Sequence, residues 1–304
     1  MTVIGRPVRI RSLCFPPSPP ERVLPSVRLA ASERPDIILL PETWQGFDPL
    51  PQDHAAFREL CGIAKAFGVY ILHSFFYDAG PDRVYNAAFL LDRSGNVQGR
   101  YDKVYPYWAE FDMPRPVTPG KEPVVFHCDF GRLGVAVCFD ANFPCVFSRL
   151  AELGAELIAW PSAYAAGDQL RAHVLNHHIP IITSTGAGSC LAFDCAGRAV
   201  YESSSPGLSV NRVTLDLDEC VFHENFNMDA RDRLLGEHPP RVAQACFLQR
   251  EQWFIMRAAR PGILAREVCA SEGMEELPAY KARSLQAIDR MRYQAACSLD
   301  YKKL

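Results

Sequence analysis

A cysteine, a glutamate and a lysine each stand just beyond a segment that is predicted to form a strand. These residues are Cys138, Glu42 and Lys103. Because strand ends on one edge of a sheet converge, and because α/β proteins bind ligands at that edge, we expect the three side chains to meet there. The segments that precede them are residues 133–137, 37–40 and 97–101.

Together these three groups form a complete set for amide chemistry. The thiolate is the nucleophile, but a thiol with a pKa near ~8.5 is mostly protonated at neutral pH. The Glu42 carboxylate could accept the proton of Cys138, and the Lys103 ammonium could stabilise the resulting thiolate. The same ammonium, together with a backbone N–H at the turn, could then stabilise the oxyanion of a tetrahedral intermediate.

A structural role for Cys138 is the alternative, since the chain has 11 cysteines and free cysteine is commonly a small core residue. The odd count, the irregular spacing and the lack of a secretory signal favour reduced thiols over a disulfide scaffold. Without a Cys-x-x-Cys pair we expect no metal site. His173, His177 and His178 could share a helix face, but without a neighbouring carboxylate pattern we assign them structural or interface roles.

Composition excludes several classes of partner. The 304 residues are 48% hydrophobic and 22% charged, as in an ordinary globular protein, and the net charge is −3 without a basic block. We therefore expect no nucleic-acid or membrane partner, but a small, roughly neutral molecule. We see no signal peptide and no apolar stretch long enough to span a bilayer, so we expect a cytoplasmic protein.

Strands and helices alternate along the first two thirds of the chain, which predicts an α/β or mixed α+β layered domain. The predicted helices cover residues 21–34, 53–67, 144–153 and 168–178, and Asp53 is a plausible cap for the second. Beyond about residue 216 we predict a loop over residues 223–241 and helices at residues 247–260 and 281–297. The predicted strands are residues 8–14, 36–40, 69–76, 84–91, 97–103, 124–127, 133–138, 157–160, 179–184, 190–194, 200–202 and 208–215.

Three signatures, in order across about residues 8–215, resemble those of the nitrilase, or carbon–nitrogen hydrolase, superfamily. They are Pro41-Glu42, then Tyr101-Asp102-Lys103-Val104-Tyr105-Pro106, and then Gly134 with Cys138-Phe139-Asp140 and Phe143-Pro144. Thr118-Pro119-Gly120 and Trp160-Pro161-Ser162-Ala163 are supporting matches. Each motif alone is weak evidence, but three in order beside predicted strands make the resemblance strong.

The resemblance implies a four-layer α-β-β-α sandwich of the nitrilase type. It implies a carbon–nitrogen hydrolase domain over residues 1–220, and we expect residues 221–304 to be a C-terminal extension that packs on the same domain or on a neighbouring subunit. Subunits of this superfamily pair through the helices that follow the cysteine and the Trp160 strand. We therefore expect a homodimer or a larger homo-oligomer.

The resemblance also implies a role for each reactive residue. Glu42 would be the general base, Lys103 would stabilise the oxyanion together with the backbone N–H of Phe139, and Cys138 would form a thioester. A second glutamate often follows the lysine motif, and Glu110 is its match in this chain. It would orient the lysine or the substrate, although a surface carboxylate is the alternative reading. No cofactor and no metal are implied.

Two departures from the superfamily pattern bear on function. Cys145 stands where members commonly carry a glutamate, which affects interface detail and not the chemistry. Nitrilases usually have Trp-Glu after the cysteine, whereas Phe139-Asp140 is closer to the amidase and carbamoylase branches. We therefore favour a linear amide or N-carbamoyl substrate over a nitrile, with a nitrilase as the alternative.

Several aromatic and polar residues in the loops after strands could wall a largely apolar pocket. Aromatic residues in such proteins are more often core than pocket, so we expect about half of them to line the site. Arg171 could bind the carboxylate of an N-carbamoyl amino acid, or could be a solvated or interface residue. The candidate substrate-binding residues are Trp44, Tyr107, Phe139, Asn142, Trp160 and Tyr164, with Trp108 and Phe143 nearby.

Two alternatives come from other classes of protein. The chain could be a non-catalytic relative that keeps the fold as a binding or assembly module, although the presence of all three reactive residues argues against this. It could also be redox-regulated through a disulfide between Cys138 and Cys145, which a turn separates.

Overall fold

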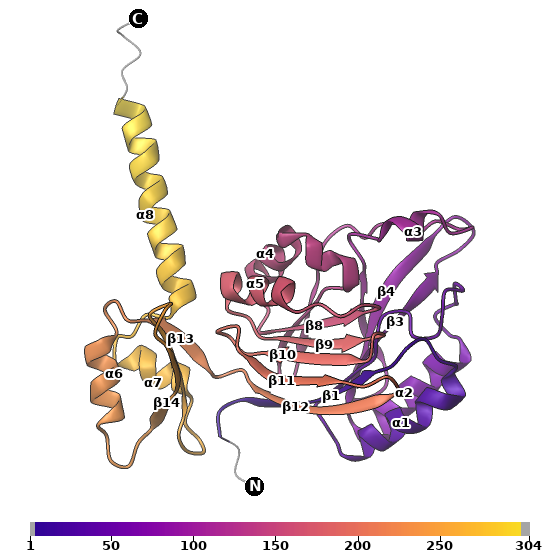
Figure 1. Cartoon of the computed structure of the whole chain (residues 1–304), viewed down its shortest axis with the longest axis horizontal. Helices are drawn as coiled ribbons and strands as arrows, with labels where there is room; N and C mark the ends of the chain where they lie inside the picture. The colour runs from indigo at the N-terminus through magenta and orange to yellow at the C-terminus, as the bar shows by residue number, and fades with distance from the viewer. Residues whose placement is uncertain (1–3, 299–304) are drawn as a thin grey trace, which may run out of the picture. The chain divides into compact units, whose positions relative to one another are not determined.

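The computed structural model describes residues 4–298, and the side chains of residues 4–293. Contacts divide it into two compact units, one spanning Arg6–Leu217 and the other containing the residues up to Gly5 and those from Asp218 onward. Figure 1 shows the first unit from indigo to orange and the second from orange to yellow. The first unit contains all of the predicted reactive residues.

Two sheets of six strands form the centre of the first unit. In the first sheet β1, β2 and β3 are parallel, and β4 and β5 follow as antiparallel neighbours. In strand order this sheet contains β12 (Ser209–Asp216), β1 (Pro7–Cys14), β2 (Ile37–Leu39), β3 (Tyr70–Asp78), β4 (Val84–Leu91) and β5 (Val97–Asp102).

The second sheet has the same pattern of parallel central strands and antiparallel edges. Strands β7, β8 and β9 are parallel, while β6 and β10 pair with them in the antiparallel sense. In strand order it contains β11 (Ala199–Ser204), β10 (Ser189–Phe193), β9 (Ile181–Thr185), β8 (Leu157–Ser162), β7 (Gly131–Val135) and β6 (Val125–Cys128).

Side-chain alternation along the strands separates the core into layers. On β1, Val8 and Ile10 point into an apolar layer between the two sheets, whereas Leu13 points to the opposite face. On the facing sheet, Leu133 and Val135 enter the same central layer. The sheets therefore pack face to face through one continuous apolar layer.

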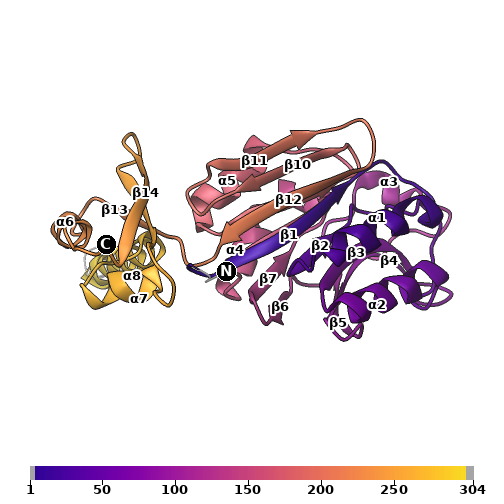
Figure 2. The ribbon, with the colours of Figure 1, turned by 90° about the horizontal axis from the view of Figure 1, so that it is seen from below.

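Two pairs of helices cover the outer faces of the sheets. Helices α1 (Pro20–Ser32) and α2 (Ala55–Phe67) bury apolar residues against the first sheet. Helices α4 (Pro144–Glu152) and α5 (Asp168–His177) do the same on the second sheet. Figure 2 shows this order of layers, and it confirms the predicted four-layer α-β-β-α sandwich.

The ends of α2 show how local sequence sets an element's bounds. His54, and not the predicted Asp53, caps the helix, because its Nδ1 accepts a hydrogen bond from the backbone N–H of Phe57 at 3.3 Å. The helix ends at Gly68, whose φ of +66° is readily available to glycine. The prediction of the helix was therefore correct, and the prediction of its cap was wrong.

Strand direction explains why the reactive residues share one edge. Because β4 reverses the chain between β3 and β5, β5 runs in the same direction as β2 and β3. Glu42 after β2 and Lys103 after β5 therefore leave the first sheet at the same edge. Cys138 after β7 and Ser162 at the end of β8 leave the second sheet at the carboxyl ends of its parallel strands.

The unit from Asp218 onward is folded more fully than the sequence indicated. It contains a three-stranded antiparallel sheet, and a helix occupies part of the segment predicted as a loop. Its elements are β13 (Cys220–His223), α6 (Met228–Leu235), β14 (Val242–Leu248), β15 (Trp253–Ala258), α7 (Ala265–Ser271) and α8 (Leu277–Ser298). How this unit packs on the first unit, or on a neighbouring subunit, stays a prediction.

The predicted helix over residues 247–260 is wrong, because this segment forms most of the β14–β15 hairpin. Gln252 takes a φ of +58° in the turn, and a bulge between Gln244 and Cys246 shifts the register of β14. Phe254, Ile255 and Met256 are all fully buried. Three consecutive apolar residues fit a strand covered on both faces, and this run cannot be told from a buried helix by its periodicity.

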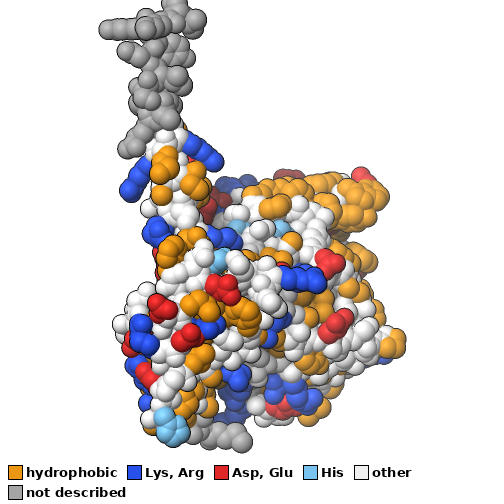
Figure 3. All heavy atoms as spheres, turned by 60° about the vertical axis from the view of Figure 1, so that its left-hand side comes forward, with side chains coloured by type: hydrophobic (Ala, Val, Ile, Leu, Met, Phe, Trp, Pro, Cys, Tyr) orange, Lys and Arg blue, Asp and Glu red, His pale blue; other side chains and the backbone are white. Residues whose placement is uncertain are grey.

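Helix α8 exposes apolar side chains along the part that the structure describes. Figure 3 shows hydrophobic and basic side chains next to one another on this helix. Leu285, Ile288 and Met291 are 57%, 45% and 71% exposed. Their spacing of three residues places them close together on the helix surface.

We expect a methyl group at Gly120 to disturb the end of β5. A Cβ at this position would lie 2.0 Å from the carbonyl oxygen of Asp102, and the Gly120 N–H donates to the carbonyl of Lys103 at 2.8 Å. Gly120→Ala should therefore lower the free energy of unfolding by at least about 2 kcal/mol.

The matched control is Gly62→Ala on the exposed side of α2, where a Cβ meets nothing within 4 Å. It should raise the free energy of unfolding by up to about 1 kcal/mol, because alanine favours the helix. Urea denaturation of both variants measures the difference. Equal stabilities would show that the backbone beside Lys103 is not tightly fixed.

Candidate active site

A buried ammonium between two carboxylates forms the centre of the site. Lys103 Nζ lies 2.8 Å from Glu42 Oε1 and 2.9 Å from Glu110 Oε2. The three residues are 1%, 5% and 7% exposed. The structure thus brings together three of the residues that the sequence predicted, from the ends of β2 and β5 and from the short helix α3 (Trp108–Phe111).

Asn86 joins the two carboxylates. It was not among the site residues predicted from the sequence. Its Nδ2 donates to Glu42 Oε1 at 2.7 Å and to Glu110 Oε1 at 2.6 Å. Asn86 lies on β4 and is 1% exposed. Asn86 is an amide within the apolar segment 84–91. This position could have indicated its role, because a buried polar group needs a hydrogen-bond partner.

Cys138 lies in a tight turn and not on the predicted strand. Strand β7 ends at Val135, and Cys138 begins the 3₁₀ turn η1 (Cys138–Asn142) with a φ of +47°. This left-handed conformation is uncommon for a residue with a side chain, and its strain is typical of functional sites. The indole Nε1 of Trp160 supports the turn by donating to the Cys138 carbonyl at 3.2 Å.

The Cys138 thiol reaches the ion cluster from the second sheet. It interacts with the Glu42 carboxylate and with the Ser162 side chain at the end of β8. Glu42 is itself held across the sandwich, since its Oε2 accepts the backbone N–H of Ala163 at 2.9 Å. The thiol, the carboxylate and the ammonium therefore form one connected group, as the strand ends predicted.

Charge interactions keep the carboxylate and the ammonium ionised. Burial alone would raise the pKa of Glu42, but the Lys103 ammonium and hydrogen bonds from Cys138, Lys103 and Asn86 lower it below its ordinary value. Burial disfavours the Lys103 ammonium, yet the negative charges around it, with Glu42 first, raise its pKa above the ordinary value. The pair is therefore ionised at neutral pH.

The Cys138 thiol, in contrast, is held in its neutral form. Burial, and next the charge of Glu42, raise the pKa of Cys138 to about 12, against the opposing effects of Lys103 and Ser162. At neutral pH the thiol is accordingly protonated beside an ionised Glu42. This is the starting arrangement that a base needs in order to take the thiol proton when a substrate arrives.

Four of the predicted substrate-binding residues lie around the cysteine turn. Phe139 is half-buried, and its ring contacts that of Tyr107 at 5.7 Å between centroids. Asn142 is exposed, and its Nδ2 donates to the Phe139 carbonyl at 3.1 Å. Tyr164 is half-buried, and its hydroxyl donates to Gln169 Oε1 at 3.3 Å, while Gln169 Nε2 donates to Asn142 Oδ1 at 2.8 Å.

The structure does not bring the two tryptophans among these candidates to the surface of the site. Trp44 is fully buried in the layer between the first sheet and helices α1 and α2, where its ring contacts Phe15. Trp160 is fully buried behind the turn and supports Cys138 through its backbone. Both side chains are apolar enough to fill a core, so their position after a strand was not sufficient evidence for a pocket.

The contacts of Arg171 and Cys145 bear on two further hypotheses from the sequence, a carboxylate receptor and a disulfide. Arg171 Nε donates to the Gly197 carbonyl at 3.0 Å. Cys138 and Cys145 are both free thiols, and Cys145 is exposed with its sulfur 3.2 Å from the Tyr105 hydroxyl. Neither contact supports a carboxylate receptor at Arg171 or a disulfide between the two cysteines.

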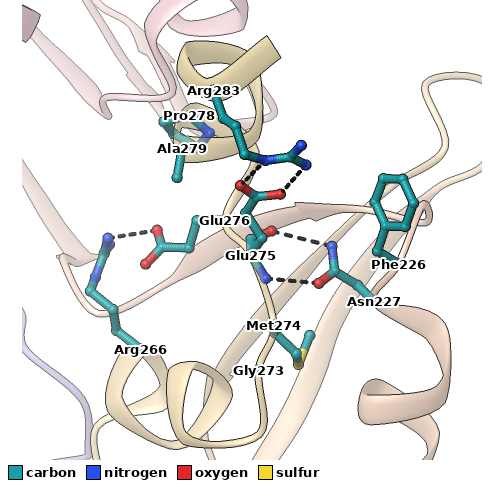
Figure 4. A pocket seen from close by; sticks show the side chains of 10 residues that line it. All are labelled: Phe226, Asn227, Arg266, Gly273, Met274, Glu275, Glu276, Pro278, Ala279 and Arg283. Atoms are coloured by element: carbon teal, nitrogen blue, oxygen red, sulfur yellow. Dashed lines mark hydrogen bonds and ion pairs between the residues drawn. The ribbon is translucent and has the colours of Figure 1, made fainter. Parts of the chain in front are cut away.

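A cavity of about 880 Å³ lies in the second unit and shares no residue with the ion cluster (Figure 4). Both arginines on its wall are paired with acidic residues of the same wall, Arg266 with Glu276 and Arg283 with Glu275. It therefore offers no unpaired charge to a ligand.

Within the described part of the chain, no helix combines the length and the apolar character that crossing a bilayer would require. The same residues contain no cluster of three or more histidine, cysteine or acidic side chains arranged to hold a metal ion.

Comparison with known proteins adds independent evidence. The sequence profile described as carbon-nitrogen hydrolase matches residues 21–222. A Mycobacterium tuberculosis protein named as a hydrolase is 35% identical over 108 residues, which are 34% of this chain and 39% of that protein. N-carbamoylputrescine amidase of Solanum lycopersicum is 29% identical over 161 residues, or 47% of this chain and 52% of the relative. The chain thus spans about half or less of the length of these curated relatives.

A solved structure matches over a larger share of its length. It is a mutant of the amidase from Nesterenkonia sp. AN1, of the nitrilase superfamily, in complex with acrylamide. It is 25% identical, with a TM-score of 0.61, and the match covers 70% of this chain and 93% of that one.

We expect the contribution of Asn86 to stability to depend on pH. Asn86→Leu removes the donors to two carboxylates, which should cost about 1.5–3 kcal/mol at neutral pH. The folded-state pKa of Glu42 is lowered, so its stabilisation is present above the unfolded-state pKa and is lost as the pH falls through the folded-state pKa. The cost of the substitution should therefore shrink in acid.

The control is Asn211→Leu on β12, where the buried amide donates to the Ser12 carbonyl and accepts from the hydroxyls of Tyr201 and Ser203. None of these partners titrates in acid, so its cost should not change with pH. Denaturant unfolding at neutral pH and at a pH below the ordinary carboxyl pKa makes the comparison. A pH-independent cost for Asn86→Leu would contradict the assigned ionisation.

Proposed function

The chain belongs to the carbon-nitrogen hydrolase family, and from this premise we propose that it hydrolyses the C–N bond of a small linear amide or N-carbamoyl compound through a thioester on Cys138. The observation that carries the proposal is a buried thiol that interacts with Glu42, which is itself paired with Lys103.

The first half of the reaction forms the thioester. As the sulfur of Cys138 attacks the carbonyl carbon, Glu42 takes the thiol proton, and the carbonyl electrons move onto the oxygen. Lys103 stabilises that oxyanion, together with the backbone N–H of Phe139. The electrons then return, Glu42 gives its proton to the leaving nitrogen, and the C–N bond breaks. Ammonia or an amine leaves, and the acyl group remains on sulfur.

The second half releases the acid. Glu42, again ionised, takes a proton from water, and the resulting hydroxide adds to the thioester carbon. Collapse of this second tetrahedral intermediate breaks the C–S bond, and the proton on Glu42 returns to the Cys138 sulfur. The enzyme is then as it was at the start, so one water is consumed for each C–N bond broken.

A thiol with a pKa of about 12 makes the base necessary. At neutral pH the thiol is almost entirely protonated, so proton transfer to Glu42 has to accompany attack. Glu110 contributes through Lys103, because it receives the second hydrogen bond of the ammonium at 2.9 Å. Its role is to orient the lysine.

Amide and N-carbamoyl substrates are both compatible with this chemistry, since each presents a carbonyl carbon bonded to nitrogen. The similar proteins of known name include an amidase in complex with acrylamide and an N-carbamoylputrescine amidase. Phe139 and Asp140 after the cysteine favour these classes over a nitrile. Activity on a nitrile remains the alternative that a substrate panel tests.

We expect Cys138→Ala to abolish ammonia release while leaving the fold intact. The panel should contain short primary amides, N-carbamoyl amines and nitriles. Glu42→Gln should lower kcat by about 10²–10⁴, because the base is lost. Lys103→Met should cause a comparable loss, because the oxyanion loses its ammonium.

Circular dichroism of each variant controls for folding. Full activity of a folded Glu42→Gln or Lys103→Met variant would refute the role assigned to that residue. If no compound releases ammonia and Cys138 reacts with iodoacetamide no faster than the other cysteines, the non-catalytic alternative gains support.

We also expect simple amides to be better substrates than N-carbamoyl amino acids. The Arg171 guanidinium is engaged with the Gly197 carbonyl, and the two glutamates beside Lys103 repel a carboxylate. The measurement is kcat/KM for a primary amide and for an N-carbamoyl amino acid of similar size, in the wild type and in Arg171→Gln. A preference for the N-carbamoyl amino acid that disappears in Arg171→Gln would reverse this assignment.

A homodimer or larger homo-oligomer is part of the proposal, because the family resemblance implies pairing through α4 and α5. Light scattering should give at least twice the mass of one chain. A monomer at working concentration would contradict it.

A further inference from the structure

We propose that Asp140 is a positioning residue that fixes the Cys138 thiol relative to the Lys103 ammonium. It is fully buried, and its carboxylate joins the turn that carries the cysteine to the strand end that carries the lysine. This inference rests on the proposed function, because it concerns the geometry of that reaction. Asp140 acts through its neighbours and is not assigned a contact with substrate.

On the cysteine side, Asp140 closes the turn around Cys138. Its Oδ2 accepts the backbone N–H of Val137 at 2.7 Å, and its own N–H donates to the Val137 carbonyl at 3.0 Å. Both hydrogen bonds join Asp140 to Val137, and Cys138 lies between these two residues in the sequence. They stabilise a backbone whose φ of +47° is otherwise unfavourable for cysteine.

On the lysine side, Asp140 holds residues on both sides of Lys103. Its Oδ2 accepts the Tyr101 hydroxyl at 2.7 Å, and its Oδ1 accepts the backbone N–H of Tyr105 at 3.0 Å. The Tyr101 hydroxyl also accepts the N–H of Val104 at 3.2 Å. The segment around Lys103 is therefore tied to one carboxylate at Tyr101 and at Tyr105, and Val104 is joined to it through the Tyr101 hydroxyl.

These contacts cross between the two sheets of the sandwich. Tyr101 belongs to β5 of the first sheet, whereas the turn that carries Asp140 follows β7 of the second. Because the nucleophile and its ammonium come from different sheets, their separation depends on how the two strand ends are joined. The Asp140 carboxylate is a direct polar connection between these ends.

The chemistry of the contacts requires a carboxylate. Asp140 receives three hydrogen bonds from outside, two from backbone N–H groups and one from a hydroxyl. An asparagine would turn an NH₂ group toward one of these donors, so at least one hydrogen bond would be replaced by a repulsive contact. Burial raises the pKa of Asp140 to about 6 against these hydrogen bonds, so the group is ionised at neutral pH.

The experiment compares Asp140→Asn and Tyr101→Phe with the wild type. Tyr101→Phe keeps the carboxylate and removes the hydroxyl that links it to β5 and accepts the Val104 N–H, and it keeps the test valid if Asp140→Asn does not fold. Two readouts are needed: steady-state kinetics on the amide substrate, and the rate at which iodoacetamide labels Cys138 at neutral pH. Mass spectrometry gives the labelling rate, with the partly exposed Cys61 of α2 as internal reference.

If Asp140 positions the two groups, kcat should fall by about a hundredfold in Asp140→Asn with KM changed only a few-fold, since a displacement of about 1 Å can cost that much. Tyr101→Phe should show a smaller loss of the same kind. Labelling of Cys138 should slow relative to Cys61. A role in stability alone predicts the reverse, because a loosened fold exposes buried thiols and speeds their labelling.

The matched control is Asp194→Asn in the turn after β10. Asp194 is also a buried carboxylate, 3% exposed, and it accepts the backbone N–H groups of Ala196 and Arg198. This variant should lose stability without slowing the labelling of Cys138. It should also not show the selective fall in kcat, with KM nearly unchanged, that is expected of Asp140→Asn.

The proposal would be overturned if folded Asp140→Asn kept the wild-type kcat and the wild-type rate of Cys138 labelling. If Asp140→Asn does not fold, the same result in Tyr101→Phe would overturn it. Slower labelling in Asp194→Asn as well would also overturn it, because the effect would not be specific to Asp140. Failure of the proposed function is a separate result, in which the wild type releases no ammonia from any compound. The labelling comparison still decides the role of Asp140 in that case.

Discussion

The ammonium of Lys103, enclosed by two carboxylates, is the interaction on which the rest of the site depends. A buried charge is tolerated only when it is paired and hydrogen-bonded, and here Glu42, Glu110 and Asn86 satisfy one another around a single positive group. Burial, and next the negative charge of Glu42, make a thiolate beside this cluster unfavourable, and they raise the pKa of Cys138 to about 12. The nucleophile is thereby kept protonated next to an ionised base until a carbonyl group is present to accept the sulfur electrons.

The sandwich brings these groups together from distant parts of the chain. The base and the ammonium leave one sheet, the thiol leaves the other, and each sheet has its own rigid helix layer. Contacts between the two strand ends are therefore as important as the reactive groups themselves. Glu42 accepts a backbone N–H from the end of β8, and Asp140 joins the cysteine turn to β5. Both contacts use a buried carboxylate as the acceptor, and each joins residues that come from different sheets.

Much of the site could be predicted from sequence, because its main residues follow predicted strands, and strand ends on one edge of a sheet converge. Glu42, Lys103 and Cys138 were found in this way, and Glu110 was found by resemblance to the family. Asn86 was missed because it lies within a strand, where only its burial reveals a partner, and Ser162 was noted only as part of a supporting motif, without a role. Trp44 was misjudged because an aromatic ring after a strand can turn inward as easily as outward. The hairpin over residues 247–260 was misread as a helix because short buried apolar runs carry no periodicity.

The most direct test of this account is the titration of the Cys138 thiol in the resting enzyme. The ultraviolet absorbance of the thiolate, taken as the difference between the wild type and Cys138→Ser across the pH range, gives its pKa. The account predicts that the thiol stays protonated through neutral pH and ionises only in the strongly alkaline range, near a pKa of about 12. A thiolate already formed at or below neutral pH would contradict it, because Glu42 would then have no proton to take.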